Sequence, residues 1–272
     1  MAVHQLVPHF RLGDETARAA VQLRALLRRL GHWGGLYAAS QERGTEALVQ
    51  PVTDLRVRPK DWVLLHHGAE SRLPSRLLHL PCHRGVVFHG LPSLRLEHGT
   101  SMERTVLAAK AQLSGMAAHV SLGIGLSGFA SAELSRAGYR EVHTVPPFVE
   151  AERFAPERAD PALRARFTSS DALTLVSVGP LTREGRLEDV LALHREVLRV
   201  RPDARLIVAG PVEAGLEAVA ADAARVPGVT MLGRVSHAEK VAVYRSGSVL
   251  VSMREHAGSA VELLEAMAAD LP

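Results

Sequence analysis

The chain has 272 residues, 47% hydrophobic and 22% charged, enough to bury the core of one large domain or of two ordinary ones. Its 32 basic and 29 acidic side chains leave a net charge of +3, which suits an anionic ligand or a membrane surface without indicating nucleic acid. A single cysteine excludes an intrachain disulfide, no apolar run is long enough to span a membrane, and the N-terminus lacks a signal-peptide pattern. We therefore expect a soluble, cytoplasmic α/β protein.

The first half of the chain alternates short apolar runs with helical patterns. The runs predict strands at residues 3–7, 62–66, 85–89, 119–122 and 141–145, and the helical patterns lie at residues 16–30, 101–114 and 131–136. Alternation of this kind, without tandem hairpins, indicates a doubly wound parallel sheet.

A second alternating series follows the paired prolines Pro146 and Pro147. It predicts strands at residues 174–178, 205–209, 229–232 and 248–253, and helices at residues 187–200, 215–225, 238–246 and from about 260. Paired prolines stiffen and extend a chain, so we expect a Rossmann-like domain at residues 1–148, a linker at 149–170 and a second such domain at 171–272. Ligands are then expected between the two domains, at the carboxyl ends of the strands.

The final segment predicts an anion pocket, because a strand feeds a turn at Gly258 and then a helix N-terminus. The chain stops at Pro272, where another buried strand is expected, so we expect the second domain to be incomplete. We expect either a fragment or a strand edge that a second copy or a partner transferase subunit covers, because an open edge favours association.

Several segments resemble GT-B glycosyltransferases of family 4. In the second half the resemblance lies in residues 177–186, 205–210, 232–239 and 255–268, and in the first half in residues 4–8, 13–14, 66–67, 88–92 and 127–134. It implies two Rossmann-like parallel-sheet domains, transfer of a hexose from a nucleoside-diphosphate sugar to a saccharide or lipid-linked acceptor, and retention of anomeric configuration. It also implies that neither a metal nor another cofactor is needed.

The resemblance assigns the donor site to the second half. Glu265 would hydrogen-bond the ribose of the donor. The other residues that we expect to bind the donor are Gly179, Arg183, Arg186, Gly233, Arg234, Val235, Glu255 and Gly258. Without the resemblance, Glu265 would equally be a surface residue and Gly258 only a turn residue.

Three charged positions that the family uses are changed in this sequence. Family members bind the donor diphosphate with an arginine and a lysine after the first strand of this domain, where this chain has Pro180 and Gly185. A glutamate near the reacting sugar is replaced by Ala257. Either Arg183 or Arg186 supplies the missing positive charge from a shifted loop, or the donor site is weakened or lost.

The acceptor side is expected in the first half. We predict His89 and Asp14 as catalytic residues, with Gly13 and His67 beside them. Plainer interpretations remain, since Gly13 and Asp14 also suit a turn and helix N-cap, and His89 also suits a buried structural role. His66 and His67 are adjacent on a strand and face opposite ways, so at most one of them lines a cleft.

Three functions stay open from the sequence. The first is a glycosyltransferase of polysaccharide biosynthesis, with a nucleotide sugar and a saccharide as its partners and with peripheral membrane contact. The second is a catalytically inactive relative that acts as a binding or assembly subunit. The third is an α/β protein of another class, such as a sugar-phosphate epimerase, that binds phosphate in the same pocket. We expect no nucleic-acid partner and no metal site.

Overall fold

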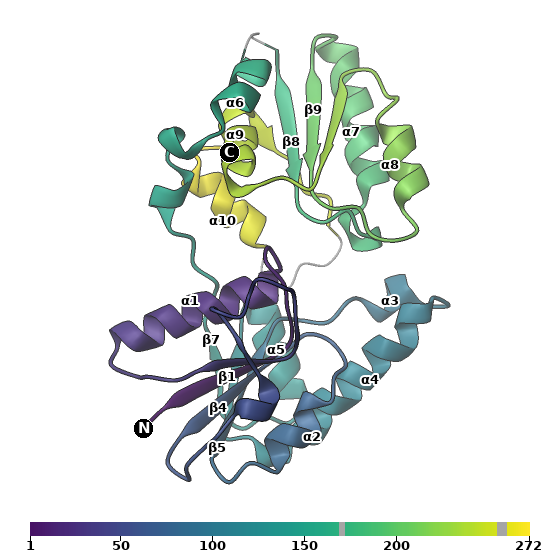
Figure 1. Cartoon of the computed structure of the whole chain (residues 1–272). Helices are drawn as coiled ribbons and strands as arrows, with labels where there is room; N and C mark the ends of the chain where they lie inside the picture. The colour runs from purple at the N-terminus through teal and green to yellow at the C-terminus, as the bar shows by residue number, and fades with distance from the viewer. Residues whose placement is uncertain (169–171, 255–259) are drawn as a thin grey trace. The chain divides into compact units, whose positions relative to one another are not determined.

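A computed structural model describes residues 1–168, 172–254 and 260–272 of the chain. The chain divides into two compact units, Met1–Pro147 and Phe148–Pro272. Each unit is built on a parallel β-sheet with helices on its faces (Figure 1), which confirms the predicted pair of Rossmann-like domains.

The first unit has a seven-stranded sheet in the order β3-β2-β1-β4-β5-β6-β7. Its strands are β1 (Val3–Phe10), β2 (Leu36–Gln41), β3 (Gln50–Pro51), β4 (Trp62–His67), β5 (His83–Phe88), β6 (Leu122–Gly125) and β7 (Val142–Thr144). Its helices are α1 (Glu15–Arg29), α2 (Leu73–Leu78), α3 (Leu94–Glu97), α4 (Ser101–Met116) and α5 (Gly128–Arg136), with short turns η1 (Val52–Asp54) and η2 (Ala117–His119). The strand order reverses direction between β1 and β4, where open α/β sheets bind their ligands.

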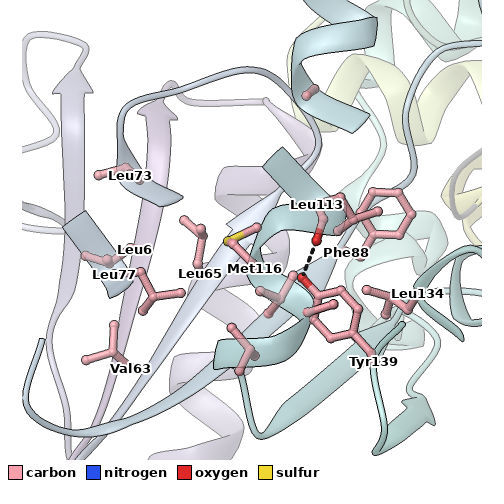
Figure 2. Close-up of a cluster of buried hydrophobic side chains, with 14 of the residues drawn as sticks. Leu6, Val63, Leu65, Leu73, Leu77, Phe88, Leu113, Met116, Leu134 and Tyr139 are labelled. Atoms are coloured by element: carbon pink, nitrogen blue, oxygen red, sulfur yellow. Dashed lines mark hydrogen bonds between the residues drawn. The ribbon is translucent and has the colours of Figure 1, made fainter. Parts of the chain in front are cut away.

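Side chains of β4 alternate between two hydrophobic layers. Val63 and Leu65 pack with α2 and α4 in the larger cluster, whereas Leu64 packs with residues of α1 on the other face. Figure 2 shows the larger cluster, in which the Tyr139 hydroxyl donates a 3.1 Å hydrogen bond to the carbonyl oxygen of Leu113. The sheet is therefore covered on both faces, as the apolar strand sequences require.

The second unit has a four-stranded sheet in the order β10-β9-β8-β11. Its strands are β8 (Thr174–Val178), β9 (Arg205–Ala209), β10 (Val229–Gly233) and β11 (Val249–Leu250). Its helices are α6 (Pro161–Thr168), α7 (Leu187–Val200), α8 (Glu217–Ala223), α9 (His237–Ser246) and α10 (Val261–Ala268), with short turns η3 (Ala151–Phe154), η4 (Pro156–Arg158) and η5 (Arg183–Gly185). Strand order reverses between β8 and β11, which places the switch point of this unit there.

The described part of the expected linker, residues 149–168, contributes to the core of the second unit. Phe154 and Phe167 are buried there beside residues of α9 and α10. Proline-rich sequence indicates an extended entry to this segment, but burial of two large aromatic side chains holds its short helices against the domain.

Candidate functional site

A small pocket lies at the switch point of the second unit. It is lined by residues that follow β8, including Gly179 and Pro180, and by Ser252, Met253 and Arg254, which follow β11. Its volume of about 30 Å³ equals the share of one water molecule in the liquid.

Glycines allow the strand-end turns to come together. A Cβ atom on Gly210 would lie 1.8 Å from the carbonyl oxygen of Gly179, so only glycine fits after β9. Gly179 itself has φ +136°, and a Cβ there would lie 2.8 Å from Nη2 of Arg254. Gly210 thus lets the two turns touch, and Gly179 leaves room for the guanidinium of Arg254 against the backbone.

Arg254 is a functional candidate that the sequence analysis missed. Its Nη2 donates to the carbonyl oxygen of Pro180 at 3.1 Å, and its Nε lies 3.2 Å from Oε1 of Glu262. The side chain is 19% exposed, so this cation is held in place and partly shielded from water. In the sequence, a role for Arg254 is indicated by its position directly after the last predicted strand of the unit.

The predicted cations after β8 have other surroundings. Arg186, with φ +50°, precedes α7, and its Nη2 lies 2.7 Å from Oδ2 of Asp189. Arg183 is exposed on η5. Among the described residues, the lining of the pocket includes Gly179 and Gly185 but neither of these arginines.

The predicted residues after β10 lie one strand further from the switch point, because β9 separates β10 from β8. The carbonyl oxygen of Gly233 accepts a 2.8 Å hydrogen bond from the amide of Gly210, which ties the two strand ends together. Arg234 is exposed, whereas Val235 packs against the core. Their contact with a donor remains a prediction.

Glu265 is almost fully buried in the second unit, with 4% of its surface exposed. Nζ of Lys240 lies 2.7 Å from its Oε1, and the hydroxyl of Tyr244 donates to its Oε2 at 3.0 Å. The carboxylate therefore joins α9 to α10. The other predictions in this region, Glu255, Ala257 and Gly258, lie outside the described residues.

A chain of polar side chains lies at the switch point of the first unit. Oε1 of Gln5, on β1, is 2.8 Å from Nε2 of His66, on β4. Nδ1 of His66 is in turn 2.8 Å from Nε2 of His89, which follows β5. Burial lowers the pKa of His66 well below its ordinary value, and burial together with His67 lowers the pKa of His89 to about 4. Both rings are therefore neutral at pH 7.

His67 faces the opposite side of the sheet from this chain. It is fully buried, its Nε2 lies 2.9 Å from the carbonyl oxygen of Ala109 on α4, and it stacks on Phe88. His67 therefore has a packing role against α4, and its acceptor-side position stays a prediction. Of the adjacent pair, alternation along β4 places His66 beside His89 instead.

Gly13 and Asp14 form the entry to α1. Gly13 has φ +87°, and Asp14 is the N-cap, with its Oδ2 accepting a 3.4 Å hydrogen bond from the amide of Ala17. Both residues are exposed. The geometry establishes the capping role, while a catalytic role for Asp14 remains a prediction.

In residues 1–168, 172–254 and 260–272, no group of three or more His, Cys, Asp or Glu side chains is arranged to hold a metal ion. Within the same ranges, no helix has both the length and the apolar character needed to cross a membrane.

The comparisons with known proteins agree with this architecture. The family model of glycosyl transferases group 1 matches residues 161–272, the part that contains both the Arg254 pocket and Glu265. No curated protein matches the sequence significantly. The glycosyl transferases group 1 region thus includes every predicted donor-binding residue.

Solved structures extend the likeness to the first unit. The sucrose-phosphate synthase of Thermosynechococcus elongatus has a TM-score of 0.73 at 13% identity, over 100% of this chain and 80% of that one. Anabaena HepE in complex with UDP and glucose gives 0.73 at 10% identity, over 100% and 80%. WaaG, a glycosyltransferase of lipopolysaccharide biosynthesis, gives 0.64 at 14% identity, over 99% and 80%. The fold of the chain is therefore GT-B.

Proposed function

We propose that this protein transfers a hexose from a nucleoside-diphosphate sugar to a saccharide or lipid-linked acceptor, with retention of anomeric configuration. The observation that carries the proposal is Arg254 at the switch point of the second unit, against the backbone of Gly179 and Pro180. A switch point is where open α/β sheets bind nucleotides, and the leaving nucleoside diphosphate needs positive charge as the glycosidic bond breaks.

Arg254, Glu265 and His89 each have a separate role in this proposal. Arg254 would bind diphosphate oxygens in bidentate fashion, which compensates for the uncharged Pro180 and Gly185. Glu265 is the carboxylate that the family resemblance assigns to the donor ribose. His89, at the end of β5 in the first unit, would contact the saccharide.

Calorimetric titration with UDP, UDP-glucose and GDP-mannose tests donor binding. We expect Arg254→Gln to lower the affinity for whichever nucleotide binds by about 10- to 100-fold, because a charge-assisted hydrogen bond contributes about 1.5–3 kcal/mol. Arg201→Gln is the matched control, because Arg201 also has a carboxylate partner, Asp203, but lies just before β9, at the amino ends of the strands and away from the pocket. Absence of binding by the unmodified chain would refute the proposal.

The alternative function is a binding or assembly subunit that has lost catalysis. Two observations favour it: Pro180 occupies a position where the family has a cation, and Arg254 already has Glu262 as an ionic partner. Donor binding without donor hydrolysis or transfer would establish this alternative. Activity gained on introducing Pro180→Arg together with Ala257→Glu would show that only the donor site had changed.

A further inference from the structure

The hydrogen-bonded chain from Gln5 through His66 to His89 crosses three strands of the first unit. We infer that Gln5 and His66 are positioning residues that fix His89 as its Nε2–H tautomer, so that Nδ1 accepts a hydrogen bond from a substrate hydroxyl. The identity of that substrate as a saccharide rests on the proposed function. The assignment of the His89 tautomer is independent of the proposed function.

The topology explains why these residues meet. In the parallel register Gln5 is paired with Leu64, and His66 is paired with Val87. Side chains at alternate positions share a face, so His66 lies on the face of Leu64, and His89 follows on the face of Val87. Leu64 and Val87 belong to the cluster that packs with α1. The polar chain therefore continues this layer at the carboxyl ends of β4 and β5.

The direction of the hydrogen bonds follows from the atoms that face one another. An amide oxygen only accepts, so Oε1 of Gln5 requires His66 to donate from Nε2. A neutral imidazole carries one N–H, which leaves Nδ1 of His66 as the acceptor for Nε2–H of His89. Nδ1 of His89 is then a lone-pair acceptor. Burial keeps both rings neutral, which this assignment requires.

The two ends of the chain differ in their access to ligand. Nδ1 of His89 and Nε2 of Gln5 are buried and have no hydrogen-bond partner among the described residues. Gln5 has no exposed surface, whereas His89 is partly exposed, so of the two unpartnered atoms Nδ1 of His89 belongs to the residue that a ligand can approach. A buried acceptor without a partner is unfavourable, and a substrate hydroxyl is a donor that would satisfy it.

Ring ¹⁵N and ¹H chemical shifts of the full chain, recorded at pH 7 without ligand, test the tautomer directly. We expect the Nε2–H pattern for His89. Gln5→Met removes the acceptor at similar volume and should give a mixture of the two tautomers. His143→Gln is the control, because His143 is exposed on β7 and its ring contacts Glu141 rather than this chain, and it should leave the His89 pattern unchanged.

Activity provides the second readout, with whichever of UDP-glucose or GDP-mannose the unmodified chain hydrolyses. We expect Gln5→Met to lower kcat by about 10- to 100-fold, the usual cost of removing a partner that orients a functional histidine, with KM for the donor unchanged. Tryptophan fluorescence checks that each variant is folded.

Two spectroscopic results would overturn the inference: an Nδ1–H tautomer in the unmodified chain, or an unchanged single tautomer in Gln5→Met. If the tautomer behaves as expected but no nucleotide sugar is bound or hydrolysed, the proposed function fails while the positioning role stands. If Gln5→Met mixes the tautomers and leaves kcat unchanged, His89 does not use its Nδ1 in the reaction and the inference is wrong.

Discussion

The ion pair between Lys240 and Glu265 gives a sharp prediction for the second unit. The pair is 2.7 Å long, and the two side chains are only 20% and 6% exposed. Removing one partner of a buried pair leaves the other charge uncompensated, which typically costs about 3–5 kcal/mol. Because Lys240 keeps a fifth of its surface in water, we expect Glu265→Leu to lower the free energy of unfolding by about 2–4 kcal/mol.

Removing both charges should recover most of this loss. Apolar side chains of similar volume often replace a buried pair at little cost. We therefore expect the double variant Glu265→Leu with Lys240→Met to have a free energy of unfolding within about 1–2 kcal/mol of that of the unmodified chain. The remaining deficit has two sources. The Tyr244 hydroxyl loses its carboxylate acceptor, and Lys240 loses its position 5.7 Å from the ring of Phe154.

Guanidinium denaturation measures both variants. Far-UV circular dichroism reports on both units, whereas fluorescence reports on the first, because both tryptophans, Trp33 and Trp62, belong to it. With a slope of about 3 kcal/mol per molar denaturant, the single variant should shift the circular dichroism midpoint by about 1 M. A loss below about 1 kcal/mol for the single variant, or a double variant less stable than the single one, would refute the reasoning.

Three further predictions concern other contacts. Tyr139→Phe should lower the stability of the first unit by about 1 kcal/mol, because a buried hydrogen bond to a main-chain carbonyl of α4 is lost; fluorescence-detected denaturation measures it. The main-chain amide of Ala2 lowers the pKa of Asp61, so the stability this carboxylate adds is present above its ordinary value of 3.8 and is lost as the pH falls through the lowered pKa. Asp61→Asn should therefore weaken the acid dependence of the fluorescence midpoint. Gly210→Ala should cost about 3 kcal/mol in circular dichroism denaturation and weaken UDP binding, because its Cβ meets the Gly179 carbonyl oxygen.

Each of these predictions has a contrary result. An unchanged midpoint for Tyr139→Phe would show that water replaces the hydroxyl. An identical acid profile for Asp61→Asn would assign the acid dependence to other groups. Normal stability and UDP binding in Gly210→Ala would show that the turns after β8 and β9 separate at no cost.

The sequence predicted best where a strand or helix carries its own apolar signal. The predicted ranges 174–178, 187–200 and 205–209 coincide with β8, α7 and β9. The strand predicted at residues 119–122 was wrong, since β6 is Leu122–Gly125 and its two glycines weaken the apolar pattern. The prediction omitted β2, because only half of its six residues are buried.

The sequence by itself determined the class of fold and the likeness to GT-B glycosyltransferases, because alternating apolar periods and ordered motifs are local properties of a chain. It also located Gly179 at a strand end. Only the tertiary structure decided which side chains meet. Gln5, His66 and His89 are 61 and 23 residues apart in sequence, and Arg254 reaches Pro180 across 74 residues. Strand order sets these contacts, and strand order depends on the packing of the whole sheet rather than on the sequence of any one strand.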